Sequence, residues 1–372
     1  MNIAVLGSGN IGTLISAQLS LNDKVNLYSR KPEKFNSLIT VFDEDTNTEY
    51  QSKINMVSDN LEKVLKNCEL VIITVPAFAI KDLIVKVFKI IDIETKVLFY
   101  PGTGGVEFYC KDFIKKGGKI YGTQRVCSVA RLKEYGKSVI TSGKRNHMFV
   151  GSIPSNCAGE FKKFIENKFD IDTTVLPNYL SVTLTPSNPI LHTSRLYSIF
   201  EDYNKECGYK YIPLFYEEWD NKSSKILIDA DNEVQRLCRK INLDLNNVKS
   251  LLEHYESKNK EELTKKIISI KSLKGIPTPS IFKNEQLHPD LDSRYFTADF
   301  PYGLMVIKAI CLIYKMETPM IDKMLFWYQK LVKKEYLVDC DHLGIDSKEI
   351  SIPQDYDLKT PLDIETFYNK EY

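Results

Sequence analysis

A glycine-rich loop near the start of the chain constrains the fold more than any other feature. Its residues fit the pattern GxGxxG, in the run Gly7-Ser8-Gly9-Asn10-Ile11-Gly12. A short apolar run, residues 3–6, precedes the loop, and apolar residues at helical spacing, residues 11–19, follow it. A strand, a glycine turn and a helix in this order are typical of a dinucleotide-binding βαβ unit. We therefore expect these six residues to bind a dinucleotide.

Each glycine of the loop has a separate physical task in such a unit. Gly7 permits the tight turn, Gly9 lets the backbone approach a pyrophosphate, and Gly12 lets the helix pack closely on the sheet. The free N–H groups and positive dipole of the helix N-terminus then hold the phosphates. The alternative is a glycine-rich turn that binds no ligand.

Strand-like and helix-like segments alternate through the first half of the chain. Strands are predicted at residues 25–28, 70–75 and 97–100, and helices at 61–65, 80–88 and 158–169. This alternation indicates βαβ units and a parallel sheet. We assign residues 1–184 to an N-terminal Rossmann domain with a doubly wound parallel sheet, and thus to the α/β class.

The pattern changes after a turn-rich segment, Thr185-Pro186-Ser187-Asn188-Pro189, which we interpret as a hinge. Long helical patterns follow it, at residues 190–200, 225–239, 248–255, 302–315 and 321–332. We assign residues 185–372 to a mostly α-helical C-terminal domain that carries the substrate site.

The composition excludes several classes of partner. The 50 basic and 49 acidic residues give a formal charge of +1, which argues against a nucleic acid or an anionic membrane as the main partner. The most apolar stretch, residues 70–80, is too short to cross a bilayer. The eight cysteines are scattered without a CxxC pair, so we expect no metal site and a reducing, cytoplasmic location.

The end of the second strand bears on the choice of cofactor. NAD-selective sites usually place an acidic residue there, to bind the ribose 2′-hydroxyl. This chain instead has Ser29-Arg30-Lys31, and a hydroxyl with two cations suits a 2′-phosphate. NADPH is therefore expected, with NADH less favoured, although Arg30 and Lys31 are also typical of a solvated loop. Pro76, which ends the central strand, is expected to line the cofactor path.

His192 is the histidine placed best for chemistry. Asn188 suits the N-cap of a helix and Pro189 its first position, so His192 lies in the first turn of the helix that opens the second domain. A histidine with a core or capping role is the alternative at this position.

A later segment favours a chemical role for His192 over a core or capping role. Its residues are Arg294-Tyr295-Phe296-Thr297-Ala298-Asp299-Phe300-Pro301. Together with Asn188-Pro189-x-x-His192 and the glycine loop, it resembles the opine dehydrogenases of the octopine and nopaline type. The resemblance spans nearly the whole chain, in the same order as in the family. The segment departs from the family pattern at Ala298, where the family commonly has Glu, and this leaves the amine partner open.

The resemblance implies roles for four residues. His192 is the expected catalytic acid–base, and Asp299 is the carboxylate that orients it and raises the pKa of its imidazole. Arg294 and Asn188 are assigned to substrate binding, with the Arg294 guanidinium gripping the carboxylate of a keto acid as a bidentate fork. A structural salt bridge is the alternative for Arg294.

The expected reaction is the reductive condensation of an α-keto acid with an amine-bearing substrate, by NADPH-dependent reduction of an imine. A keto-acid reductase resembling ketopantoate reductase is one alternative, although that family relies on a lysine and a glutamate. A non-catalytic protein that senses NADPH is the other. The sequence leaves the oligomeric state open, with a homodimer as the candidate assembly.

Overall fold

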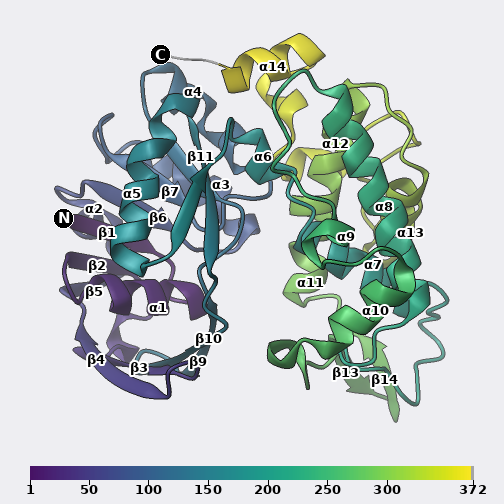
Figure 1. The fold of residues 1–372 in the computed structure, drawn as a ribbon, viewed down its shortest axis with the longest axis horizontal. Coiled ribbons are helices and arrows are strands. Elements are labelled where there is room, and N and C mark those ends of the chain that lie inside the picture. The colour runs from purple at the N-terminus through teal and green to yellow at the C-terminus, as the bar shows by residue number, and fades with distance from the viewer. Residues whose placement is uncertain (370–372) are drawn as a thin grey trace. The chain divides into compact units, whose positions relative to one another are not determined.

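The computed structural model describes residues 1–369. The chain divides into two compact units: Met1–Thr183 with a C-terminal segment that begins at Thr366, and Leu184–Glu365. Strands gather in the first unit and helices in the second (Figure 1). An α/β unit followed by a mostly helical unit confirms the fold class expected from the sequence.

An eight-stranded sheet forms the centre of the first unit, in the order β12-β11-β8-β7-β6-β1-β2-β5. Neighbouring strands are parallel except β11 and β8. From β5 to β8 the order is that of a Rossmann fold, and it reverses between β1 and β6. The bounds are β1 Asn2–Leu6, β2 Lys24–Tyr28, β5 Met56–Ser58, β6 Leu70–Ile73, β7 Lys96–Phe99, β8 Ile120–Thr123, β11 His147–Ile153 and β12 Asp172–Val175.

The apolar runs of the sequence form the centre of this sheet because both of its faces are covered. Ile3 to Leu6 of β1 are fully buried, and residues of β6 are 2% exposed or less. Parallel strands covered on both faces have nearly continuous apolar sequences, as these do. The helices of this unit are α1 Asn10–Leu19, α2 Leu61–Leu65, α3 Ala77–Val87, α4 Lys111–Lys115, α5 Ala158–Phe169 and α6 Leu180–Thr183.

A second sheet of four strands, which the sequence did not predict, packs against α1. Its order is β4-β3-β10-β9, and β3 pairs with β10 in parallel although about a hundred residues separate them. Pairing over that distance leaves no local pattern in the sequence. The bounds are β3 Leu38–Asp43, β4 Thr48–Lys53, β9 Val129–Glu134 and β10 Ser138–Ser142.

The second unit is built on α7, α8 and α13, which pack against one another. Its helices are α7 Asn188–Phe200, α8 Asn221–Lys240, α9 Leu251–His254, α10 Lys260–Ser269, α11 Arg294–Thr297, α12 Met305–Ile313 and α13 Pro319–Val332. The sequence analysis missed α10 and the hairpin of β13 Ser280–Lys283 with β14 Gln286–Pro289. The helical stretch 294–313 has the length and hydropathy of a membrane span, but 72% of its most apolar window is buried inside the protein, as in a core helix.

The last described residues, 366–369, depart from the division expected at residue 185, because they belong to the first unit. The last helix, α14 (Pro361–Asn369), is divided between the units at Thr366. Tyr368 donates a hydrogen bond of 2.6 Å from its hydroxyl to Oε1 of Glu107, and Thr183 donates to the same oxygen. Glu107 is fully buried, and this burial raises the pKa of its carboxyl to about 7.

We predict that Glu107 makes the stability of the first unit depend on pH. Its pKa is about 7 in the folded protein and about 4.5 in the unfolded chain, so stability is full below about pH 4.5 and falls as pH rises through about 7. The loss is on the order of 3 kcal/mol, because the buried carboxyl must then carry a charge. Urea-unfolding midpoints at about pH 5 and pH 8.5 measure the effect.

Glu107→Gln keeps the acceptor for Tyr368 but cannot ionise. The free energy of unfolding of Glu107→Gln should therefore exceed that of the wild type at the higher pH. At the lower pH the two free energies should be nearly equal. The exposed Glu94 provides a control, since Glu94→Gln should follow the wild type at both pH values. Equal pH dependence in Glu107→Gln and the wild type would contradict the assignment.

Candidate active site

The glycine loop joins β1 to α1 at the point where the strand order reverses. Gly7 has a φ of 118°, a conformation that side chains other than glycine rarely adopt. The Thr74 hydroxyl, which follows β6, donates to the carbonyl oxygens of Leu6 and Gly7 at 3.2 Å each. These two hydrogen bonds from the end of β6 fix the conformation of the loop. Pro76, two residues after Thr74, occupies the N-cap position of α3.

The loop fits a dinucleotide pyrophosphate. A Cβ at Gly12 would lie 1.7 Å from the Gly7 carbonyl oxygen, so only glycine allows α1 to start this close to the strand. A Cβ at Gly9 would meet nothing within 4 Å, so bare backbone borders open space there. Gly9 is the N-cap of α1, and no side chain caps this helix. Its first-turn N–H groups and positive dipole end are suited to an anion.

A cluster of three hydroxyls lies between the glycine loop and the end of β2. The Ser8 hydroxyl is 3.0 Å from that of Ser29 and 2.8 Å from that of Tyr135, and the Ser29 and Tyr135 hydroxyls are 3.0 Å apart. Ser29 is 1% exposed, whereas Arg30 and Lys31 are exposed. The end of β2 therefore offers a buried hydroxyl next to two cations, at the place where Rossmann domains bind the adenosine ribose.

Tyr135 reaches this place because its hairpin, β9–β10, is fixed on both sides. The Asn10 side chain accepts a hydrogen bond from the Leu132 N–H at 3.0 Å, which ties the hairpin to α1. The Gly136 carbonyl accepts from the Asn36 N–H at 2.9 Å, and a Cβ at Gly136 would lie 2.1 Å from the Lys34 carbonyl oxygen. The sequence analysis missed Tyr135, whose only local signal is a Tyr-Gly turn.

In the second unit, the structure brings His192 and Asp299 together. His192 Nδ1 and Asp299 Oδ2 are 2.7 Å apart, and His192 is only 8% exposed. Because a carboxylate only accepts hydrogen bonds, Nδ1 carries the proton and Nε2 is left for a second partner. That partner is the Tyr216 hydroxyl, at 2.8 Å.

Close backbone packing explains how two residues 107 positions apart come into contact. Asp299 immediately precedes a π turn, Phe300–Leu304, in which the Leu304 N–H donates to the Asp299 carbonyl. A Cβ at Gly303 would lie 2.8 Å from the Pro189 ring, so the missing side chain lets the start of α7 rest on this turn. His192 lies one turn after Pro189 and therefore faces Asp299.

The predicted N-cap of α7 is wrong by one residue. The Leu191 N–H donates to the Ser187 carbonyl at 2.9 Å, so helical hydrogen bonding starts at Ser187, and Asn188 is the first residue of the helix. Asn188 is exposed there. Arg294 begins α11 and is also exposed. The structure thus joins the two residues assigned to proton transfer, while the two assigned to substrate binding face solvent.

Arg195, which the sequence analysis missed, fixes the loop that carries Tyr216. It is fully buried one helical turn after His192. Its guanidinium donates to the carbonyls of Leu214, Phe215 and Glu218 at 3.2, 2.9 and 2.6 Å. Burial lowers the pKa of Arg195 to about 10, which leaves it charged at neutral pH. Neither residue type nor spacing in the sequence indicated this contact.

A second buried histidine provides a comparison. His288, on β14, is also 8% exposed, and its Nδ1 is 3.0 Å from the Tyr203 hydroxyl. Its Nε2 has no hydrogen-bond partner among the described residues. His288 thus pairs with a tyrosine hydroxyl but lacks a carboxylate partner of the kind that His192 has. His192 is therefore the better candidate for an acid–base.

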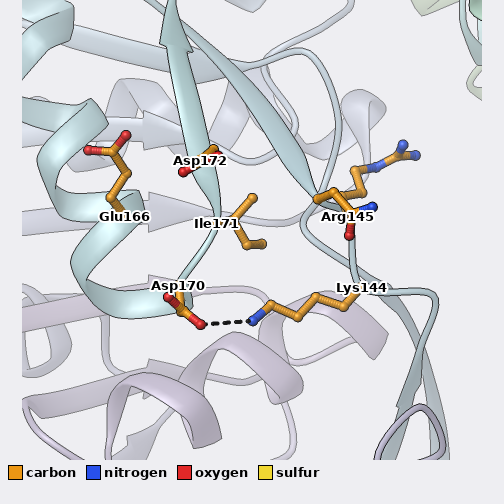
Figure 2. A pocket seen from close by; sticks show the side chains of 7 residues that line it. Lys144, Arg145, Glu166, Asp170, Ile171 and Asp172 are labelled. Carbon is orange, nitrogen blue, oxygen red and sulfur yellow. Dashed lines mark ion pairs between the residues drawn. The ribbon is translucent and has the colours of Figure 1, made fainter.

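The first unit also has a hollow of about 420 Å³ beside β11 and β12 (Figure 2). Charges of both signs line it, and Lys144 and Asp170 form an ion pair at 3.9 Å across it (Figure 2). None of the residues that the sequence analysis singled out lines this hollow. We assign it no function.

Comparison with known proteins covers both units. Residues 175–332 match the family model for the alpha-helical domain of NAD/NADP octopine/nopaline dehydrogenase. Tauropine dehydrogenase of Arabella iricolor is 27% identical over 83% of this chain and 83% of that protein. Octopine dehydrogenase of Pecten maximus is 24% identical over 97% of each. The second unit therefore matches the helical domain of the octopine/nopaline dehydrogenase family, and the whole chain is similar to opine dehydrogenases.

These matches indicate an NAD(P)H-dependent oxidoreductase acting on a CH–NH bond, with a nicotinamide dinucleotide as cofactor. A solved structure of octopine dehydrogenase with NADH and L-arginine shares the fold, with a TM-score of 0.87 at 23% identity over 100% of this chain and 98% of that one. Residues 3–148 also match the ketopantoate reductase model PanE/ApbA. That match ends before the elements that carry His192 and Asp299.

We predict that the Tyr135 hydroxyl contributes to dinucleotide binding. Tyr135→Phe removes one member of the hydroxyl cluster and should raise the Kd for both NADH and NADPH by roughly 3- to 10-fold, the worth of one hydrogen bond. Fluorescence titration of the reduced dinucleotides measures it. Tyr50→Phe, on β4 of the same second sheet, should leave both Kd values unchanged; an equal Kd for Tyr135→Phe and wild type would exclude the contribution.

Proposed function

We propose that the protein is an NADPH-dependent opine dehydrogenase that condenses an α-keto acid with the amino group of an amino acid or related amine. The contact between His192 and Asp299 carries the proposal, because it supplies a buried acid–base in a chain that also has a dinucleotide loop. Similarity to the opine dehydrogenases supplies the class of reaction.

The residues of the second unit would supply and remove protons. Asp299 accepts from His192 Nδ1 and fixes the tautomer, so Nε2 is the ring nitrogen that takes up and delivers a proton. The keto acid and amine lose water to form an imine, and protonation of the departing hydroxyl and of the imine nitrogen both favour the forward reaction. The bound cofactor supplies the hydride that completes the reduction.

Arg294 and Asn188 remain our candidates for binding the substrate. Both are exposed and lie near the dyad in sequence: Arg294 is five residues before Asp299 and Asn188 is four before His192. A guanidinium that is not buried in a structural salt bridge is free to form a fork with a keto-acid carboxylate. The exposure of Arg294 supports this role.

The preference for NADPH rests on the end of β2. Ser29 accepts a hydrogen bond from the Lys31 N–H at 3.2 Å, and the exposed Arg30 and Lys31 side chains follow it. No acidic residue stands at positions 29–31 to bind a ribose 2′-hydroxyl. Two exposed cations favour the additional charge of a 2′-phosphate.

We expect NADPH to be oxidised only when an α-keto acid and an amine are both present. The measurement is a screen of amino acids and related amines against pyruvate, 2-oxobutyrate, 2-oxoglutarate and glyoxylate, followed at the absorbance of the reduced dinucleotide. For the productive pair, His192→Asn should lower kcat by roughly 10²- to 10⁴-fold, the usual worth of a positioned acid–base. The Kd for NADPH should not change.

His288→Asn is the matched control, because it removes a histidine of equal burial that lacks a carboxylate partner. It should retain the wild-type kcat. Oxidation of NADPH by a keto acid alone would favour a reductase of the ketopantoate type. Tight NADPH binding without turnover in the whole screen would favour a sensor.

We also predict that Arg30→Asp flattens or reverses the cofactor preference. The wild type should have the higher kcat/KM with NADPH, and loss of one charged contact with the 2′-phosphate should cost roughly 10-fold or more. Lys34→Asp makes the same change of charge four residues further on and should have a much smaller effect. A wild type that prefers NADH, with unchanged selectivity in Arg30→Asp, would show that the adenosine pocket lies elsewhere.

A further inference from the structure

The nitrogen that should deliver the proton is already hydrogen-bonded to another side chain. His192 Nε2 is 2.8 Å from the Tyr216 hydroxyl, and Tyr216 is 5% exposed. Asp299 holds the other ring nitrogen. A substrate therefore meets the Tyr216 hydroxyl where a bare imidazole nitrogen is needed.

The loop that carries Tyr216 is fixed by a buried cation. The buried Arg195 guanidinium bonds to the carbonyls of three residues in its loop, Leu214, Phe215 and Glu218. Moving the loop would leave a buried cation without these acceptors, which is costly. The Tyr216 ring is also stacked with that of Trp219, whose centroid is 6.4 Å away, and Arg195 lies over the Trp219 ring.

A third side chain continues this line of hydrogen-bonding groups. Tyr295 lies next to Arg294 on α11, and its ring is 4.4 Å from that of His192, centroid to centroid. It is also a side-chain hydrogen-bonding neighbour of Tyr216. Tyr295 is half-buried, whereas His192 and Tyr216 are buried. The three side chains thus run from the buried imidazole to the surface.

We propose that Tyr216 and Tyr295 relay the proton between His192 and the reacting substrate. The relay rests on the proposed function and adds two residues to it. The Nε2 proton of His192 moves to the Tyr216 oxygen, while the Tyr216 proton moves to the Tyr295 oxygen. The Tyr295 proton moves to the departing hydroxyl or the imine nitrogen, so both tyrosines end neutral and the substrate gains one proton.

The protonation of Tyr216 is consistent with this role. Burial raises the pKa of its phenol well above 10, so the group stays neutral over the working pH range. A neutral hydroxyl both donates and accepts, which a relay requires. The charged and titratable groups that face His192 and Tyr216 are Asp299, Tyr295 and, more distantly, Tyr255. Asp299 fixes the orientation of the imidazole through Nδ1, and the tyrosines carry the proton from Nε2 to the substrate.

The first test is kinetic, on the full-length enzyme with its productive substrate pair. Tyr216→Phe and Tyr295→Phe should each lower kcat by roughly 10²-fold, while the Kd for NADPH remains unchanged. The double variant should lose no more than the poorer single variant, because both residues belong to one path. Tyr203→Phe is the matched control, since it removes a tyrosine hydroxyl from the His288 pair, and it should retain the wild-type kcat.

The second test needs no turnover. In protein labelled with ¹⁵N-histidine, at a pH where both ring nitrogens of His192 are protonated and with His192 assigned by comparison with His192→Asn, the Nε2 proton should exchange with water more slowly in Tyr216→Phe and Tyr295→Phe. Tyr203→Phe should leave it unchanged. Unaltered exchange in Tyr216→Phe would overturn the relay whether or not the enzyme is active.

A wild-type kcat in Tyr216→Phe, with opine formation intact, would also overturn the relay and leave the proposed function standing. Absence of opine formation in the wild type, with slowed exchange in both variants, would instead overturn the proposed function and support the proton path. The two hypotheses are therefore separated by the pair of measurements.

Discussion

The hydrogen bond between His192 and Asp299 depends on a single close approach of backbone in the second unit. Gly303 has no side chain, so the Pro189 ring can rest on the π turn that follows Asp299. Any Cβ there would push α7 away from the turn and separate the imidazole from the carboxylate. The chemistry assigned to this unit is therefore set by packing one helical turn away from each reacting group.

The first unit uses the same principle at the glycine loop. Gly12 lets α1 begin against the Gly7 carbonyl, and Thr74 from the neighbouring strand closes the turn. The second sheet then supports the loop from outside, because Tyr135 bonds to both Ser8 and Ser29. Small residues permit these close approaches of backbone to backbone. Hydroxyl groups from distant strands then form hydrogen bonds with the polar groups of the loop.

Local sequence patterns were sufficient to predict the strands and helices whose apolar residues recur at a regular spacing. The apolar runs of β1, β2, β6 and β7, the amphipathic helix α5 and the long helices of the second unit were predicted with nearly correct bounds. The second sheet was missed because β3 and β10, which join its two hairpins, pair over a long distance and β4 is mostly polar. The N-cap of α7 was misplaced by one residue, since Ser187 and Asn188 both suit that position and only the hydrogen bond of Leu191 distinguishes them.

The sequence by itself determined the fold class, the glycine-rich loop between β1 and α1, and the two residues, His192 and Asp299, that the structure joins. Glycine spacing, apolar periodicity and short motifs are properties of neighbouring residues. Only the tertiary structure decided what surrounds the loop and these two residues. Tyr135, Tyr216 and Arg195 act through contacts with residues far away or on other elements, and their types are equally common in cores. Side-chain hydrogen bonds between distant elements depend on how the elements pack, and no local spacing encodes that packing.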